Sequence, residues 1–122
     1  MMIKGIGLDI VEIMRIQRAN DMSDKFKERI LTARELAIFK QLKTRRQLEF
    51  LAGRFSAKEA YAKANGTGLG RACKLHDIEI LPNAVGKPEL YFKGEKTGDF
   101  VSITHSKEYA AAQVIIMENF SK

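Results

Sequence analysis

The chain has 122 residues, 45% of them hydrophobic, and a net charge of +6 at pH 7, which suits one domain with a real core. Its single cysteine, Cys73, excludes an internal disulfide, and no apolar run is long enough to span a membrane. The N-terminal residues lack the plan of a signal peptide, so we expect a cytoplasmic protein that makes no membrane contact.

A strand is predicted over residues 3–10, because large apolar residues alternate there with small or acidic ones. One face carries Ile6, Leu8 and Ile10, and the other carries Gly5, Gly7 and Asp9. Two glycines on one face let another group approach the backbone closely, and Asp9 ends the strand at that place. Asp9 is therefore either a functional carboxylate or the cap of a following helix through Val11–Arg18.

The positive charge is concentrated in one part of the chain. Residues 15–46 contain ten basic and four acidic residues, which accounts for the whole net charge of +6. A basic surface of this kind implies an acidic partner, namely nucleic acid, anionic lipid or an acidic protein. The alternative is a solvated helical face without a partner.

Two short helices are predicted within this basic segment. The first surrounds Phe26 and Ile30, whose apolar side chains lie among charged ones. The second begins at a capping box formed by Thr32 and Glu35 and extends to about Leu42.

A long helix follows, and one of its residues is unusual. Thr44 and Gln47 have the form of a capping box, and Asn65–Gly66 supplies a left-handed stop, so the helix spans about twenty residues. Glu59 lies inside the apolar sector, where an ionised carboxylate must be paired or bound to a metal. The helix alone leaves two interpretations open: a rim salt bridge to Lys63, or a metal or acid–base carboxylate backed by that lysine.

The chain after the long helix is predicted to form strands. Gly66–Gly70 is glycine-rich, but it closes a helix instead of following a strand, so it is a weak phosphate-binding signal. Strands are expected at residues 77–81, 89–93, 100–104 and 110–117, joined by turns. The sum is one α+β domain over residues 1–122: an N-terminal strand, a helical block with one long central helix, and an antiparallel β meander.

Six segments together form a specific pattern that spans nearly the whole chain. They are GIGLDIVEIMRI (Gly5–Ile16), RILTARE (Arg29–Glu35), FLAGRFSAKEAYAKANGTGLG (Phe50–Gly70), DIEI (Asp77–Ile80), GKP (Gly86–Pro88) and VSITHS (Val101–Ser106). With this ordered set the chain resembles the holo-acyl-carrier-protein synthases, the small bacterial class of 4′-phosphopantetheinyl transferases.

The resemblance implies a fold and a reaction. The fold would be the single phosphopantetheinyl transferase domain, and the reaction would move 4′-phosphopantetheine from coenzyme A to a serine of acyl carrier protein. Adenosine 3′,5′-bisphosphate would be released, and the holo carrier would support fatty acid biosynthesis. Members of the family need Mg²⁺, with Mn²⁺ as the alternative ion, and generally form homotrimers with the active site between neighbouring subunits.

The resemblance also assigns site residues. Asp9 and Glu59 match the metal-binding carboxylates, and Lys63 matches the lysine near the phosphates, where it would stabilise or protonate the leaving bisphosphate. The positions matched to the coenzyme A site are Arg54, Lys63, Lys87, Pro88 and His105. The general base stays open among Asp9, Glu59 and a metal-bound water. Lys58 is either a further coenzyme A ligand or a solvated charge.

The basic segment gains a partner from the same resemblance. Acyl carrier proteins are acidic helical bundles, so Arg15 and Arg18 would attract the carrier electrostatically. Phe26 and Ile30 would form the apolar centre of the contact.

Two other functions fit the residues alone. A nucleic-acid-binding module would use the same basic segment, but aromatic residues make up only 8% of the chain and are not interleaved with basic ones as in single-strand binders. Another Mg²⁺-dependent phosphoryl enzyme, such as a nucleotide hydrolase, would use the same two carboxylates without a carrier protein. We therefore expect an enzyme that binds no nucleic acid.

Overall fold

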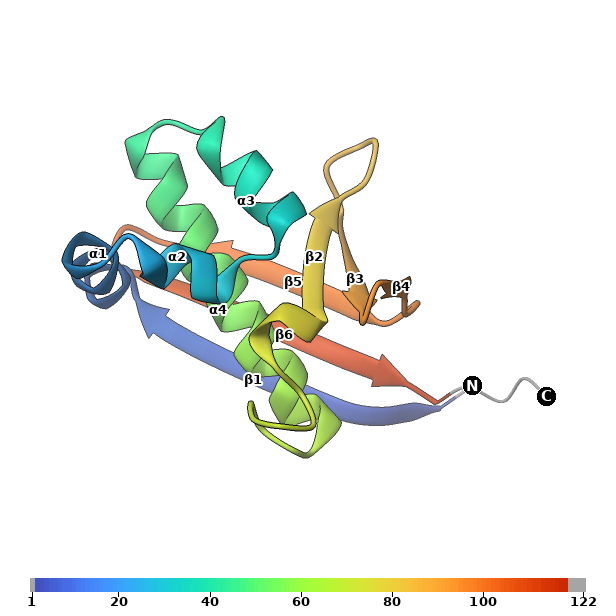
Figure 1. Ribbon diagram of the computed structural model, residues 1–122. Coiled ribbons are helices and arrows are strands. Elements are labelled where there is room, and N and C mark those ends of the chain that lie inside the picture. Colours follow the sequence, from blue (N-terminus) through green and yellow to red (C-terminus); the bar gives the residue numbers. More distant parts are fainter. Residues whose placement is uncertain (1, 119–122) are drawn as a thin grey trace.

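Helices and two three-stranded sheets form residues 2–118, the part of the chain that this computed structural model describes (Figure 1). In chain order the elements are β1 (Ile3–Glu12), α1 (Ile13–Met22), α2 (Lys25–Ile30), α3 (Ala33–Lys40), α4 (Thr44–Asn65), the short 3₁₀ helix η1 (Leu75–Asp77), β2 (Ile78–Pro82), β3 (Pro88–Phe92), β4 (Glu95–Lys96), β5 (Phe100–His105) and β6 (Tyr109–Met117). This is the predicted α+β arrangement, and every strand pair is antiparallel. The later strands divide between two sheets, β2-β3-β4 and β1-β6-β5, a division that the sequence did not predict.

The first strand packs directly against the long helix. β1 is an edge of the sheet β1-β6-β5, and α4 contacts all three strands of that sheet (Figure 1). A Cβ atom at Gly5 or Gly7 would collide with the carbonyl oxygen of Ala64 or Ala60 in α4. The glycines therefore allow the close backbone approach that the sequence predicted, and the group that approaches is the helix.

The opposite face of this sheet, which we call the outer face, is apolar and exposed. Its large residues include Ile6, Leu8 and Ile10 on β1 and Phe100 on β5, which are 57%, 63%, 65% and 52% exposed. Ile6 and Phe100 both pair with Ile115 of β6, so their side chains share a face. The alternation along β1 correctly predicts two different faces. The face with the small residues is the one that packs against the rest of the chain.

Two helix ends follow the predicted chemistry. Thr32 Oγ1 accepts from the Glu35 N–H at 3.3 Å, and Glu35 Oε1 accepts from the Thr32 N–H at 2.9 Å, which confirms the capping box at the start of α3. α4 ends at Asn65, and Gly66 adopts the left-handed conformation with φ of 86°, as expected for a glycine stop.

The capping box predicted at the start of α4 is wrong. Thr44 is the first helical residue, and Lys43 precedes it without a side-chain cap hydrogen bond. The Gln47 amide instead donates to the Phe39 carbonyl oxygen at 3.0 Å and thereby joins α4 to α3. The Gln47 side chain therefore makes a contact between two helices instead of the cap that the local pattern predicted.

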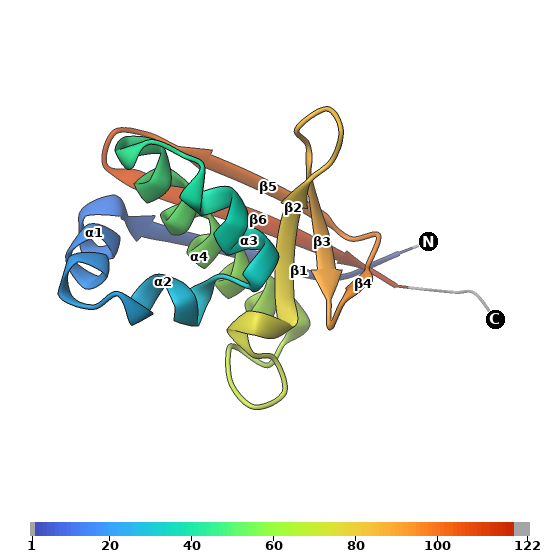
Figure 2. The same cartoon turned by 45° about the horizontal axis from the view of Figure 1, so that its top comes forward.

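The second sheet packs with α4 and completes the core. β2 and β3 run across the direction of β5 and β6, while α1 lies at the end of the molecule opposite to the start of β1 and the end of β6 (Figures 1 and 2). Ile80, Leu90 and Val114 are fully buried with Ala57 and Ala60 in the core cluster between the sheets and α4. Within residues 2–118, no helix is long and apolar enough to cross a membrane.

Candidate active site

The second half of β1 and the second half of α4 bring three predicted residues together. β1 continues past Asp9 to Glu12, which directly precedes α1, so the prediction that Asp9 ends the strand is wrong, and Asp9 does not cap the next helix. Lys63 Nζ donates to Asp9 Oδ1 at 3.0 Å and to the Leu8 carbonyl oxygen at 3.2 Å. Ser56 Oγ donates to the Asp9 carbonyl oxygen at 3.0 Å and so fixes this part of β1 to α4. Glu59 lies on the same helix one turn before Lys63. We call Asp9, Glu59 and Lys63 the carboxylate cluster.

The charges of the carboxylate cluster act on one another. Burial raises the pKa of Glu59, the nearby Asp9 carboxylate raises it further, and Lys63 lowers it. Lys63 makes its ion pair with Asp9, so the predicted alternative of a Glu59–Lys63 salt bridge is wrong. Within residues 2–118, Glu59 has no ion-pair partner of its own, and the Asp9 carboxylate is near enough to raise its pKa.

Two neighbouring carboxylates fit a divalent cation. Mg²⁺ is usually held by one or two carboxylates, with water and phosphate oxygens completing its octahedron. No group of three His, Cys, Asp or Glu side chains able to hold a metal occurs in residues 2–118. Asp9 and Glu59 therefore offer the small ligand set that Mg²⁺ takes beside a phosphorylated substrate, and a cation there would relieve the repulsion that raises the Glu59 pKa.

A cavity of about 200 Å³ lies between α4, β5 and the start of β3. Arg54, Pro88 and His105, three of the residues matched to a coenzyme A site, line it together with Phe50 and Gly53. We call this the β5 cavity. Its lining combines apolar surface with a few polar groups, as small-molecule sites do.

Arg54 is the cation best placed to bind an anion in the β5 cavity. Its Nε donates to the Ile80 carbonyl oxygen at 3.2 Å, and its guanidinium carbon lies 4.2 Å from the centroid of the Phe50 ring. Burial lowers the pKa of Arg54 to about 10. In the described part of the chain no carboxylate forms a salt bridge with it, so its remaining N–H groups suit a phosphate.

Two other residues predicted to bind coenzyme A, His105 and Lys87, line different cavities. His105 Nε2 lies 3.5 Å from Glu49 Oε1, and Glu49 also accepts from Arg46 Nη1 at 2.9 Å. The Arg46 hydrogen bond holds the pKa of Glu49 below its ordinary value. Lys87 does not line the β5 cavity; it lines a neighbouring cavity of about 140 Å³ that shares Pro88.

The carboxylate cluster and the β5 cavity lie at opposite edges of one sheet. Asp9 on β1 pairs with Ala112 on β6, and Ala112 pairs with Ile103 on β5. Strands are spaced about 4.8 Å apart, so the two edges are separated by about 10 Å. The lining of the β5 cavity includes no residue of the carboxylate cluster. One chain therefore does not bring all the predicted donor and metal residues into one cavity.

Helix α1 presents the predicted basic residues, but one apolar prediction is wrong. Arg15 and Arg18 are exposed, and Phe26 on α2 is half-buried. Ile30 is only 1% exposed and packs in the hydrophobic core. It therefore cannot be the apolar centre of a contact with a partner.

Two methionines on α1 are exposed apolar residues that the sequence prediction missed. Met14 is 58% exposed and Met22 is 86% exposed. Residues 14, 18 and 22 are four apart, so both methionines and Arg18 share one face of α1. This spacing was available in the sequence and is the signal that would have found them.

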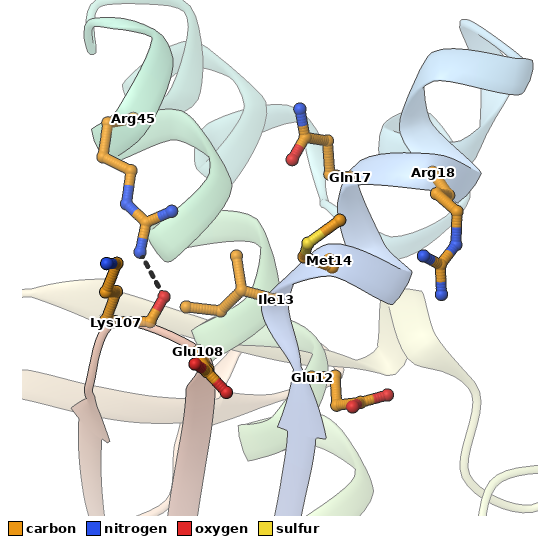
Figure 3. A pocket seen from close by; sticks show the side chains of 8 residues that line it. All are labelled: Glu12, Ile13, Met14, Gln17, Arg18, Arg45, Lys107 and Glu108. Carbon is orange, nitrogen blue, oxygen red and sulfur yellow. Dashed lines mark hydrogen bonds between the residues drawn. The ribbon is translucent and has the colours of Figure 1, made fainter.

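A cavity of about 410 Å³ borders this face of α1 (Figure 3). Met14 and Arg18 line it from α1, and Arg45 and Lys107 line it from α4 and the turn between β5 and β6. The Arg45 guanidinium donates to the Lys107 carbonyl oxygen at 2.7 Å, as the dashed line in Figure 3 marks. Three basic side chains line this cavity together with two carboxylates, Glu12 and Glu108, so its lining carries a small excess of positive charge.

Both interpretations of Lys58 are wrong. Its side chain is fully buried, and Nζ lies 2.6 Å from Oε1 of the equally buried Glu35. It is neither a solvated charge nor a ligand that can reach a nucleotide.

Comparison with known proteins places the chain in a family. The family model of the 4′-phosphopantetheinyl transferase superfamily matches residues 5–114, so the chain belongs to that superfamily. Its relatives there are holo-[acyl-carrier-protein] synthases. The relative from Bacillus pumilus is 60% identical over 118 residues, which cover 94% of this chain and 96% of the relative.

Solved structures agree with this assignment. A holo-(acyl-carrier-protein) synthase from Bacillus anthracis in complex with CoA (3′,5′-ADP) matches with a TM-score of 0.83 at 50% identity, covering 94% of this chain and 96% of that chain. The holo-[acyl-carrier-protein] synthase from Neisseria meningitidis matches with a TM-score of 0.87 at 36% identity, covering 96% and 100%. The predicted family and fold are therefore confirmed.

Proposed function

We propose that the chain transfers 4′-phosphopantetheine from coenzyme A to a serine of acyl carrier protein and releases adenosine 3′,5′-bisphosphate. The observation that carries the proposal is the carboxylate cluster, where Lys63 pairs with Asp9 and the Asp9 carboxylate raises the pKa of the nearby Glu59, in a chain 60% identical to a holo-[acyl-carrier-protein] synthase. The reaction converts apo carrier protein to the holo form for fatty acid biosynthesis. A cytoplasmic location belongs to the same proposal.

In this proposal Asp9 and Glu59 hold Mg²⁺, with Mn²⁺ as the alternative ion. The ion supplies neutralisation of the negative charge on the pyrophosphate during phosphoryl transfer. Lys63 Nζ lies 3.0 Å from Asp9 Oδ1, and its positive charge also acts on the pyrophosphate. It thereby stabilises the leaving bisphosphate. The serine proton passes to one of the two carboxylates, directly or through a water.

The β5 cavity is proposed as the site of the nucleotide part of coenzyme A. Phe50 and Pro88 offer apolar surface to the adenine ring, and Arg54 and His105 offer N–H donors to the phosphates. Lys87 contacts the donor from the neighbouring cavity on the other side of Pro88.

Two copies of the chain are then needed for one complete site. The donor and metal residues lie at opposite edges of the sheet, and in a cyclic homotrimer one copy presents its carboxylate cluster to the β5 cavity of the next. The outer face supports this assembly, because Ile6, Leu8 and Ile10 form an exposed apolar surface of the kind that marks a protein interface.

Acyl carrier protein is proposed to dock on α1. Arg15 and Arg18 attract its acidic surface, and the arrangement of charges favours fast and specific association. Met22, which is 86% exposed, takes the place of the buried Ile30 as the apolar centre, with the half-buried Phe26 beside it.

The intact mass of an apo acyl carrier protein tests the proposed reaction. After incubation with the chain, coenzyme A and Mg²⁺, the carrier should gain the mass of one phosphopantetheine. The gain should be lost with EDTA and with Glu59→Gln, and kept with Glu95→Gln, the same change at an exposed residue of β4. A gain that survives Glu59→Gln removes Glu59 from the metal site. No gain on several carriers with folded protein contradicts the transferase assignment.

A further inference from the structure

The proposed reaction leaves one buried ion pair unused. Lys58 on α4 and Glu35 on α3 are both fully buried, with Nζ and Oε1 2.6 Å apart. Burial lowers the pKa of Lys58, and the Glu35 carboxylate raises it again. Two charges removed from water are tolerated only where further hydrogen bonds satisfy them, so the other partners of this pair show what it holds in place.

Two further hydrogen bonds of the pair reach other elements, and a third caps α3 itself. Lys58 Nζ also donates to the Ile30 carbonyl oxygen at the end of α2, at 2.6 Å. Glu35 Oε1 also accepts from the Thr32 N–H, at 2.9 Å, and Glu35 Oε2 accepts from the Ile80 N–H in β2, at 2.8 Å. The pair therefore joins α4 to α2, α3 and β2.

The bond to Ile80 connects the pair to the β5 cavity. β2 is an edge strand of the sheet β2-β3-β4, so the Ile80 N–H and carbonyl on its free edge have no neighbouring strand. Glu35 binds the N–H, and Arg54 donates to the carbonyl oxygen at 3.2 Å. A carboxylate and a guanidinium thus occupy the positions that the backbone of another strand would take.

The position of β2 also determines one wall of the β5 cavity. Pro82 at the end of β2 pairs with Pro88 at the start of β3, and both prolines line the cavity together with Arg54. The position of one residue, Ile80, therefore affects both the Arg54 guanidinium and the proline wall. Apolar side chains in place of Glu35 and Lys58 would fill the space, but they would bind neither the Ile80 N–H nor the Ile30 carbonyl.

We propose that the Glu35–Lys58 pair is a positioning device for the donor site: it holds the edge of β2 at the distance from α4 at which Arg54 and the proline wall bind the nucleotide. Neither residue touches the substrate, and both act through Ile80 and Arg54. The inference rests on the proposed function, because it takes the β5 cavity as the site of the nucleotide.

The test replaces the pair with apolar residues of similar volume, Glu35→Leu with Lys58→Met. Replacing a buried ion pair by apolar residues often costs little by itself, but the Ile80 N–H, the Ile30 carbonyl and the Thr32 N–H each lose a partner, so the thermal unfolding temperature should fall. Affinity is therefore measured well below that temperature, where the variant is folded. The dissociation constant of adenosine 3′,5′-bisphosphate, measured by titration calorimetry, should rise by about tenfold because Ile80 loses its directional contact. Glu35→Gln with Lys58→Met restores an acceptor for the Ile80 N–H and should recover most of the affinity.

The matched control is Arg34→Ala. Arg34 and Glu79 also join α3 to β2, at 2.7 Å, but the Arg34 side chain is 60% exposed. Its removal should change the dissociation constant by less than about twofold, as for other surface ion pairs. A folded apolar variant with wild-type affinity would overturn the inference while leaving the proposed function intact.

Two further outcomes are also decisive. If the apolar variant does not fold, Lys58→Met alone carries the test, because it removes the link of Glu35 to α4 and leaves the Glu35 carboxylate buried without its partner; wild-type affinity in that variant would overturn the inference. If the wild-type chain neither binds adenosine 3′,5′-bisphosphate nor transfers phosphopantetheine, the proposed function fails, and this inference fails with it.

Discussion

The surroundings of Glu59 disfavour the negative charge of its carboxylate. Burial raises its pKa, and the Asp9 carboxylate raises it further. The folded chain therefore binds a proton at Glu59 more tightly than the unfolded chain does. The corresponding contribution to the free energy of unfolding is complete below the ordinary pKa of glutamate and is lost as pH rises through the raised pKa. At neutral pH the residue proposed to bind the metal lowers stability.

Glu59→Gln should separate activity from stability. Without divalent ions, the variant should unfold at the same temperature as the wild type or higher at about pH 8. This difference should shrink as pH falls toward about 4, where Glu59 is mostly protonated in both the folded and the unfolded chain. Transfer activity should be lost at both pH values. Thermal unfolding followed by circular dichroism makes the measurement, and a variant that unfolds well below the wild type at the higher pH would contradict the charge repulsion described for this cluster.

At the scale of elements, the contact between β1 and α4 sets the active-site geometry. Gly5 and Gly7 allow the helix to lie against the strand, and Ser56 and Lys63 then bind the strand at Asp9 and Leu8. The carboxylate cluster exists because of this close packing.

Gly7→Ala tests the packing of β1 on α4. The added Cβ would meet the Ala60 carbonyl oxygen, so strand and helix must separate, and the free energy of unfolding should fall by about 1–3 kcal/mol. Gly70→Ala is the matched control, because a Cβ there has no neighbour within 4 Å; its effect should stay within about 0.5 kcal/mol. Urea unfolding of both variants makes the comparison, and equal losses would show that the close approach is not what Gly7 provides.

Helix α1 carries the prediction about the carrier protein. Arg15→Glu should raise the KM for acyl carrier protein by about tenfold and leave the KM for coenzyme A nearly unchanged, because only the first partner meets α1. Lys40→Glu makes the same change of charge on α3 and should have a much smaller effect. Steady-state kinetics with each substrate varied in turn decides the matter, and an unchanged KM for the carrier would remove α1 as the docking site.

Two patterns confined to a few neighbouring residues were predicted correctly. The capping box of Thr32 and Glu35 and the glycine stop at Gly66 are local, and the structure contains both. Asp9 and Glu59 were matched to their roles by the ordered motifs, and the fold brings them together with Lys63.

Predictions that depended on a distant partner were less successful. Lys58 is buried because Glu35, 23 residues earlier, meets it in the core, and no helical periodicity could show that. Gln47 donates to a carbonyl oxygen of α3 instead of forming the predicted cap. The alternation at Ile6 and Gly7 predicts that β1 has two different faces, but it does not say which face is buried. It therefore could not show that the apolar face is exposed in the single chain.

At the scale of the whole molecule, the outer face and the divided site point to the same arrangement. An exposed apolar sheet face and a donor cavity on the far edge from the carboxylate cluster are both accounted for by the proposed trimer. The proposal assigns the interface to the outer face and the active site to the join between copies.

Leu8→Asp should break this assembly. A charge placed on the outer face at a residue that is 63% exposed in the single chain costs little in the monomer but cannot be buried between copies. Sedimentation should show the monomer of 13.8 kDa for this variant and the trimer for the wild type. Val85→Asp, the same kind of change at an apolar residue that is 87% exposed on the turn between β2 and β3, should remain trimeric. A trimeric Leu8→Asp protein would place the interface elsewhere.

The most direct test of the account mixes two inactive proteins. One carries Glu59→Gln and lacks the carboxylate cluster, and the other carries Arg54→Gln with His105→Ala and lacks the donor cavity. If each site joins the two edges from different copies, unfolding and refolding the proteins together in equal amounts should restore about a quarter of the wild-type transfer activity by random assortment. No activity above that of the separate proteins, in a mixture shown to contain mixed trimers, would mean that each chain completes its own site and would contradict the account.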